Sequence, residues 1–213
     1  MKQTAVYIYV MTNDSGFAPC IQNNWLTLAC CKGGIKGGMR KSAAKEFQAG
    51  KNVYLLGLCG KTLARETAYL PVYLAKVDEV IDMIDYYADD GRAAGRQDNV
   101  YRVENGELIA KANNPHSDYC RAKDLGGQYV LCSHQFTYWG NKCGTSGTEI
   151  EQEYSELFAS IRKRNSFRGH IVFRENHFIE TAKTWSWFPK QTKHCNVISK
   201  RSIKGDLISG RKC

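Results

Sequence analysis

The alternation of apolar and polar positions predicts a chain built mainly from strands. Residues 5–11 form an apolar run bounded by turn residues, which is typical of a strand buried on both faces. Residues 52–59 repeat this pattern, and residues 69–80 supply a partner strand with Pro71 near its start. Residues 128–140 predict a further strand that ends in aromatic positions. Strands should therefore outnumber helices.

Helical periodicity is confined to three segments. Residues 40–47 have helix-forming composition, and residues 80–87 place apolar side chains on one face before a glycine ends the pattern. Residues 149–163 give the clearest stripe, and Thr148 is a natural N-cap. The polar section 91–118 between them reads as an excursion that contains one small hairpin around an Asn-Gly turn.

These elements predict an α+β fold with a small mixed or antiparallel sheet that curls toward a barrel and carries a few flanking helices. The layout is reminiscent of PUA-like and EVE-like domains, which read modified bases, although layout alone does not establish function. We expect one domain over residues 1–190 and a basic C-terminal extension over residues 191–213.

Composition narrows the class of protein. A chain of 213 residues can bury a core without cross-links, and its nine cysteines are scattered and odd in number. No apolar leader or run of about 20 apolar residues is present, so we expect a reduced, cytoplasmic protein that does not span a membrane.

The net charge of +9 is unevenly distributed. Residues 22–51 carry +5 and residues 162–213 carry +10, whereas residues 52–161 carry −6. Two basic segments around an acidic middle suit a protein that binds nucleic acid, because Lys and Arg neutralise phosphates. A basic, solvated surface with no such partner is the alternative.

The segment after the first strand combines turn residues, two thiols and glycine-flanked cations. Lys32, Lys36 and Arg40 are candidates to bind phosphate, and the glycines among them would let backbone amides approach it. Cys30 or Cys31, next to a lysine, could act as a nucleophile, although buried structural cysteines are more common.

Other motifs suggest chemistry less directly. His116, Asp118 and Asp124 place an imidazole near two carboxylates, a grouping that suits general acid and base catalysis, although polar loops often hold such residues. Cys132, His134 and Cys143 could supply three zinc ligands, but their spacing matches no zinc motif, and we predict no metal site. No nucleotide-binding or metalloprotease signature is present, and no cofactor is indicated.

Several blocks, in order over about residues 5–140, resemble the nucleotide-modification-associated domain, type two. The blocks are Asp14–Pro19, Thr27–Lys32, Lys76–Val80, Asp98–Tyr101, Lys123–Leu125 and Val130–Gly140. The resemblance implies a role in bacterial and phage systems that make or handle modified bases in DNA. It implies no particular reaction. The glycine-rich segment 33–38 departs from the family's pattern.

We therefore expect a protein of a DNA base-modification pathway that binds a nucleotide or modified base in an aromatic and basic pocket, either as a reader or as an enzyme that transfers or removes a group. A basic interaction protein without a pocket is the third possibility. Expected partners are DNA or nucleotides, together with proteins of a modification system. Asp14, Asp98 and His116 are the candidate catalytic residues, and the candidate nucleotide-binding residues are Lys32, Lys36, Arg40, Asn99, Tyr101, Tyr138 and Trp139.

Overall fold

The fold is taken from a computed structural model, which describes residues 2–36, 38–64, 67–88, 90–139, 149–164 and 169–174. The strands are β1 (Thr4–Met11), β2 (Cys20–Gln22), β3 (Trp25–Leu28), β4 (Asn52–Cys59), β5 (Pro71–Lys76), β6 (Glu79–Asp82), β7 (Tyr101–Glu104), β8 (Glu107–Ala110), β9 (Tyr129–Ser133), β10 (Gln135–Tyr138) and β11 (His170–Phe173). The helices are α1 (Met39–Gln48), α2 (Met83–Ala88), α3 (Asp90–Ala93), α4 (Asp118–Leu125), α5 (Glu149–Glu153) and α6 (Ser155–Arg162).

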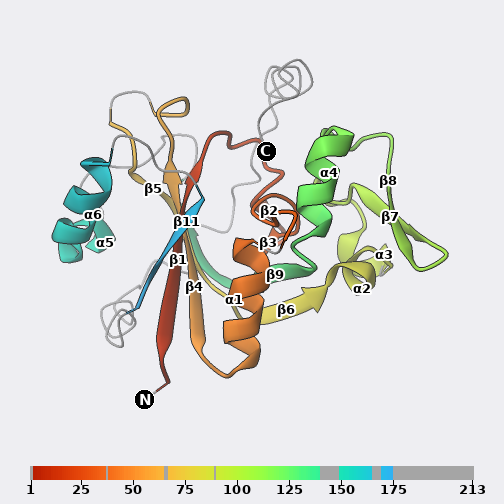
Figure 1. Ribbon diagram of the computed structural model, residues 1–213, viewed down its shortest axis with the longest axis horizontal. Helices are drawn as coiled ribbons and strands as arrows, with labels where there is room; N and C mark the ends of the chain where they lie inside the picture. Colours follow the sequence, from red (N-terminus) through yellow and green to blue (C-terminus); the bar gives the residue numbers. More distant parts are fainter. Residues whose placement is uncertain are drawn as a thin grey trace.

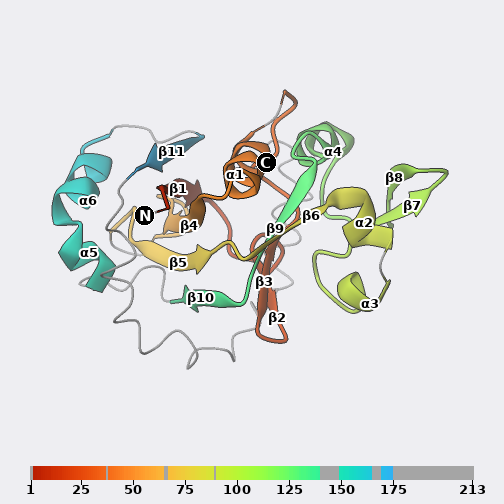
Figure 2. The same ribbon diagram turned by 90° about the horizontal axis from the view of Figure 1, so that it is seen from below.

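The larger sheet has the strand order β10-β5-β4-β1-β11 (Figure 2). β1 and β4 are parallel and form its centre, and the other neighbours pair antiparallel. Side chains of β1 alternate between two cores: Tyr7 and Tyr9 belong to one, Val6 and Ile8 to the other. The apolar run predicted for residues 5–11 is confirmed, and its continuity reflects burial on both faces.

The smaller sheet has the order β2-β3-β9-β6 and is antiparallel. It shares two bent segments with the larger sheet, because β5 leads directly into β6 and β9 leads directly into β10. At the bend, the backbone N–H of His134 donates to the Asp78 carboxylate at 2.6 Å. The strands predicted over 69–80 and 128–140 are thus each divided between two sheets.

Helices and the β7–β8 hairpin surround these sheets (Figures 1 and 2). α1 contacts β1, β4 and β9. α5 and α6 cover the outer face of the larger sheet, where Phe158 and Ile161 pack with Val6 and Ile8. At the opposite end, α2 contacts the β7–β8 hairpin. In the described ranges the sheets do not close into a barrel; the mixed α+β class is confirmed, and the PUA-like or EVE-like curvature stays a prediction.

The helices follow the predictions only in part. The helix predicted over 80–87 begins at Met83, because residues 80–82 belong to strand β6, and no helix was predicted over α3. The helix predicted over 149–163 is broken at Tyr154, whose backbone leaves the helical region while its ring packs on Phe173. α4 lies in a segment for which no helix was predicted. Thr148 and the extension 191–213 lie outside the described residues. Across the described ranges, no helix combines the length and apolarity needed to cross a membrane.

Candidate active site

Cys31 lies on the turn that connects β3 to α1. Cys31 and Lys32 both have left-handed backbones, with φ values of 60° and 52°, which is uncommon for residues other than glycine. Such conformations cluster at functional sites, and a nucleophile on a strand-to-helix turn is presented to the space above the sheet. The neighbouring Cys30 is fully buried, and burial raises its thiol pKa well above the usual value. The two thiols of the pair are therefore chemically distinct.

His116 lies between the Cys31 thiol and the Asp124 carboxylate. Its Nε2 is 3.9 Å from Cys31 Sγ, and its Nδ1 is 2.5 Å from Asp124 Oδ2. The imidazole is also held by an edge-on contact with Phe17, with ring centroids 4.8 Å apart. The backbone N–H of His116 donates to the Asn114 side chain at 2.9 Å. Thiol, imidazole and carboxylate thus stand in the order of a cysteine-nucleophile triad.

The surroundings of His116 favour its protonated form. Burial lowers its pKa, but the hydrogen bonds and charges of Asp124 and Cys31 outweigh burial and raise the pKa from 6.5 to about 10. At neutral pH the site therefore holds a proton on His116 that can be passed to a leaving group.

The Asp124 carboxylate is fixed by donors from three segments. It is fully buried on α4, and besides His116 it accepts from the backbone N–H of Cys31 at 2.9 Å and from the Tyr101 hydroxyl at 3.1 Å. The buried Arg40 guanidinium donates to the carbonyls of Cys31 at 2.9 Å and Tyr129 at 2.6 Å, and also to the Asp124 carbonyl. Arg40 therefore ties the nucleophile turn to α4.

Glycines allow the nucleophile turn to lie directly against the end of α4. A Cβ atom added at Gly33 would overlap the Lys123 carbonyl, and one at Gly126 would overlap the Gly34 carbonyl. A Cβ atom at Gly127 would overlap the Arg40 guanidinium. This close backbone packing sets the distance between Cys31 and Asp124. The close packing accounts for glycine at positions 33, 126 and 127, and phosphate binding by the glycine-rich turn stays a prediction.

A cavity of about 310 Å³ opens beside the triad. Its lining joins the end of β1, the loop after it, the nucleophile turn, α4 and the start of β11; the principal side chains are Tyr9, Phe17, Cys31, Lys32, His116 and His170. A concave site with apolar walls and a few convergent polar groups is the usual form of a small-molecule site. The geometry can therefore bring a substrate to the Cys31 thiol.

Lys32 is a largely buried cation in this cavity. Its ammonium donates to the Val10 carbonyl at 3.0 Å and lies 4.8 Å from the centre of the Tyr9 ring. Burial lowers its pKa from the usual value. The Tyr9 hydroxyl is hydrogen-bonded to that of Tyr73 at 2.5 Å, which holds the ring beneath the ammonium. Lys32, a predicted phosphate ligand, thus lies beside Cys31 in the cavity lining.

The chain matches the model of a protein family, described as nucleotide modification associated domain 2, over residues 3–195. It belongs to this family. The resemblance seen in the sequence is confirmed, and the match continues beyond the residues on which that resemblance rested. No curated protein and no solved structure matches the chain.

Among the predicted catalytic residues of this nucleotide-modification domain, only His116 lines the cavity. Asp98 is fully buried elsewhere; it accepts from Thr27 at 2.5 Å and Tyr86 at 3.0 Å and lies 3.3 Å from Arg96. Asp14 accepts from the Tyr138 hydroxyl at 2.5 Å, and burial raises its pKa. Tyr138 thus pairs with Asp14 and is absent from the cavity lining, and Trp139 packs against the core that contains Val6 and Ile8.

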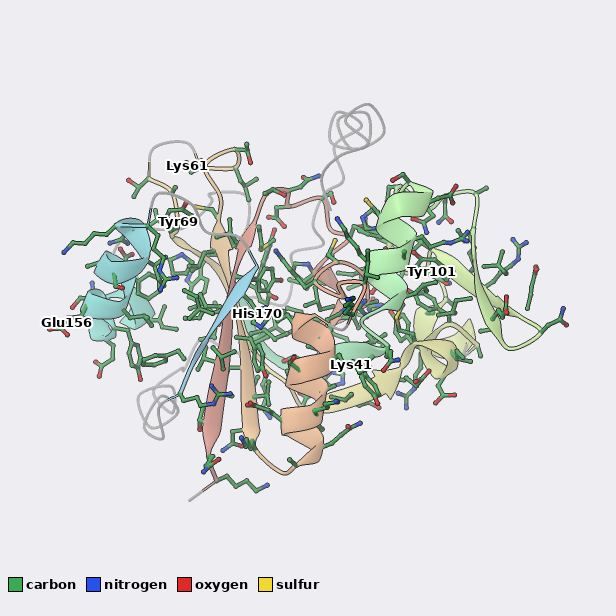
Figure 3. The ribbon with its side chains drawn as sticks, in the orientation of Figure 1. Lys41, Lys61, Tyr69, Tyr101, Glu156 and His170 are labelled. Carbon is green, nitrogen blue, oxygen red and sulfur yellow. The ribbon has the colours of Figure 1, made fainter. Side chains whose placement is uncertain are left out.

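The other predicted nucleotide-binding residues are dispersed. Lys36 is exposed on the loop before α1. Asn99 accepts from Lys111 at 2.8 Å, away from the cavity lining. Tyr101 supports Asp124, and Figure 3 shows it at the β7 end of the molecule, while His170 projects from β11 near α1. Direct binding by these residues stays a prediction.

Within the described residues, no group of three or more His, Cys, Asp or Glu side chains could hold a metal ion. Cys132 is buried in β9, whereas His134 is exposed and stacks on Trp25 with ring centroids 6.0 Å apart. Cys143 lies outside the described residues. Among the described residues, the free thiols are Cys20, Cys30, Cys31, Cys59 and Cys132. Cys120 is disulfide-bonded, so the expectation that the thiols are reduced does not hold for this residue.

Two features of the site were not found in the sequence. The Cys31 turn and the His116–Asp124 segment were noted separately, but nothing in their spacing showed that they meet. His170 and Tyr9 were not singled out at all. Tyr9 follows the pattern of a buried strand, so only the pairing of β1 with β11, which sets Tyr9 opposite His170, reveals their place in the cavity.

Proposed function

We propose that this protein is a thiol-dependent enzyme of a nucleotide-modification pathway, with Cys31 as the nucleophile. The observation that carries the proposal is the alignment of Cys31, His116 and Asp124 beside a cavity. Cys31 Sγ lies 3.9 Å from His116 Nε2, and His116 Nδ1 lies 2.5 Å from Asp124 Oδ2. Such a series activates a thiol for attack on a carbonyl carbon. The reaction class it supports best is acyl transfer or hydrolysis at an amide or ester group carried by a nucleotide.

In the proposed mechanism, His116 donates and accepts the protons that the reaction moves. With the shared proton on His116 Nε2, the Cys31 thiolate attacks the carbonyl carbon and forms a carbon–sulfur bond. His116 then gives its proton to the leaving amine or alcohol as the bond to carbon breaks, which leaves a thioester on Cys31. A water molecule, or an acceptor amine, attacks the thioester after passing a proton to His116, and the thiolate departs.

Neighbouring residues support this chemistry. Asp124 keeps the imidazole in one orientation and balances its charge, and Tyr101 in turn fixes that carboxylate. The lysines of the lining, Lys32 and Lys123, supply the positive charge that would stabilise the negative oxygen that develops during attack. Phe17 and Tyr9 offer apolar surface for a base.

A reader that binds a modified nucleotide without turnover is the second candidate. It is favoured by the same Lys32 and aromatic lining, which would bind a nucleotide with or without catalysis. The two candidates differ in what they require of Cys31. A reader needs it only as part of the wall, whereas the enzyme cannot work without its sulfur.

The deciding experiment incubates the purified protein with extracts of nucleotides and of modified DNA digested to nucleotides, and follows changes by mass spectrometry. Turnover by the wild type that is lost in Cys31→Ser and kept in Cys59→Ser supports the enzyme. A covalent adduct on the Cys31 peptide would identify the acyl group. Retained turnover in Cys31→Ser would sink the thiol mechanism, and binding with no turnover in either protein would favour the reader.

A further inference from the structure

The charges around the cavity are unbalanced. Its lining holds two lysines, Lys32 and Lys123, and the raised pKa of His116 adds a third cation at neutral pH. Asp124 is the single acidic residue of that lining, and its carboxylate is hydrogen-bonded to His116. The proposed mechanism also places a thiolate on Cys31, so the lining holds one more positive than negative charge, and a partly buried site screens this charge poorly.

We infer that the cavity binds a single nucleotide unit through its phosphate, which lies between Lys32 and His170. This inference rests on the proposed function and names the substrate class for that site. The two side chains come from different elements, the nucleophile turn and β11, and both line the cavity. A phosphate held between them would lie on the same cavity wall as Tyr9, which pairs with His170 across β1 and β11.

Lys32 is suited to bind phosphate because its ammonium is only partly engaged. It has three N–H donors, of which the Val10 carbonyl accepts one. Its contact with the Tyr9 ring leaves its full charge in place. Charge-assisted hydrogen bonds from ammonium to phosphate are stronger than neutral ones.

His170 would act as a neutral donor. Burial and the charge of Lys32 both lower its pKa, so its imidazole is uncharged at neutral pH and offers one N–H. The ionisable groups beside it are Lys32, Tyr7, whose ring centroid is 5.7 Å away, and Tyr9, its cross-strand partner. A bound phosphate would offset the charge of Lys32 and raise the pKa of His170.

The size of the cavity limits the ligand. A volume of about 310 Å³ is at the small end of ligand sites and suits one nucleotide rather than a duplex. The unit could be a free mononucleotide or a nucleotide of a single strand turned into the cavity. Both sources present the same phosphate chemistry.

Calorimetry tests the inference with the four 2′-deoxynucleoside 5′-monophosphates and the matching nucleosides. In the wild type we expect at least one monophosphate to bind about tenfold or more tightly than its nucleoside. Lys32→Met should reduce that advantage below about twofold, while Lys32→Arg keeps most of it. Lys45→Met is the matched control, because Lys45 is exposed on α1 away from the cavity, and it should change nothing. Equal affinity of the wild type for nucleotide and nucleoside would overturn the inference.

NMR titration of His170 gives a readout that does not depend on catalysis. Saturation with the tightest monophosphate should raise the pKa of His170, and the nucleoside should leave it unchanged. An unchanged His170 pKa on monophosphate binding would overturn its place in the phosphate site. Calorimetry with a ten-nucleotide single strand distinguishes a free mononucleotide from a nucleotide within a strand. Tighter binding of the strand than of the monophosphate would identify a nucleotide within a strand as the ligand, and weaker binding would identify the free mononucleotide.

Cys31→Ser separates this inference from the proposed function. The variant should keep the phosphate preference, because the sulfur does not contact the phosphate. If Cys31→Ser keeps the preference for the monophosphate over the nucleoside and the wild type shows no turnover, only the thiol mechanism is contradicted. Turnover that depends on Cys31 but shows no phosphate preference would remove only the inference drawn here.

Discussion

Two carboxylates in this molecule are equally buried but have different surroundings. Asp98 and Asp124 are both 0% exposed, and each accepts from a tyrosine hydroxyl. They differ in their third partner. Asp98 faces the permanent cation Arg96, whereas Asp124 faces His116, which titrates and reaches a thiol on its other side.

The Asp98 cluster consists of Asp98, Arg96, Thr27 and Tyr86, and none of these residues lines the cavity. Arg96 also donates to the carbonyls of Cys20 and Gln22, each at 3.2 Å, and to the Thr27 hydroxyl at 2.8 Å. The ion pair thus joins the β2–β3 hairpin to the polar segment before β7. Asp124 opens onto a cavity through His116 instead. A buried carboxylate indicates a reactive site only when its hydrogen bonds lead to a titratable group that a substrate can reach.

The largest expected effect is that of Asp98→Ala on folding. The change leaves Arg96 as an uncompensated buried charge, so we expect a loss of about 3–5 kcal/mol in the free energy of unfolding. Urea unfolding measures it. Asp118→Ala is the control, because that carboxylate is 99% exposed beside Arg121 and should be nearly neutral. A loss below about 1 kcal/mol for Asp98→Ala would show that the cluster is not structural.

Asp98 also shows the limit of the sequence. Asp98 in the polar stretch 98–101 was predicted to lie in a site. It faces Arg96, two residues earlier, instead of a cavity, and nothing in the sequence shows this. Only some strand positions were predictable from local pattern: β1, β4 and the β7–β8 hairpin are close to their predicted ranges, whereas no strand was predicted over β2, β3 or β11. Local pattern carries this information because each run is bounded by its own turn residues.

The triad was not predictable for a different reason. Cys31, His116 and Asp124 are separated by 85 and 8 residues along the chain, and the helix that positions Asp124 was not predicted. The buried arginine that joins the two segments looked like a phosphate ligand. Only tertiary packing through glycines brings the segments together, and no periodicity records such packing.

The next effect concerns the reactivity of Cys31. If His116 stabilises the thiolate, His116→Ala should slow alkylation of Cys31 by iodoacetamide at pH 7 by about 10–100-fold. Peptide mass spectrometry follows the modified residue. His134→Ala is the matched control, because its imidazole is exposed and stacks on Trp25 away from the cavity. Equal alkylation rates in all three proteins would mean that the imidazole does not activate the thiol. Asp124 would then have only a structural role, like Asp98.

A smaller effect should appear in the pH dependence of stability. The pKa of His116 is raised from 6.5 to about 10, so the folded protein holds a proton that the unfolded chain releases between those values. His116 therefore contributes its full stabilisation below about pH 6.5 and loses it as pH rises toward 10. The slope should be at most about −1.4 kcal/mol per pH unit.

Urea unfolding of the wild type and His116→Gln across this window isolates the contribution of His116. The difference between the two proteins should shrink steadily with rising pH. A constant difference would show that His116 does not bind an extra proton in the folded state. Other groups that titrate in this window, such as the Cys20 thiol, whose pKa burial raises to about 12, are present in both proteins and cancel from the difference.

The smallest effect compares the two tyrosines. Tyr101→Phe removes a single hydrogen bond to Asp124, and we expect a loss of about 1 kcal/mol in the free energy of unfolding. Tyr86→Phe should cost more, because its hydroxyl both donates to Asp98 and accepts from Arg96 Nε at 3.1 Å.

The two changes should also differ at His116. The Tyr101 hydroxyl and His116 Nδ1 share the same oxygen of Asp124, so removing the hydroxyl leaves that oxygen to the imidazole alone. NMR titration should then find the pKa of His116 unchanged or slightly higher in Tyr101→Phe and unaltered in Tyr86→Phe. A fall in the pKa of His116 in Tyr101→Phe would mean that Tyr101 orients the carboxylate rather than competing for it. The hydrogen bond between Asp124 and His116 would then depend on the β7–β8 hairpin, and substitutions in that hairpin would reach the thiol.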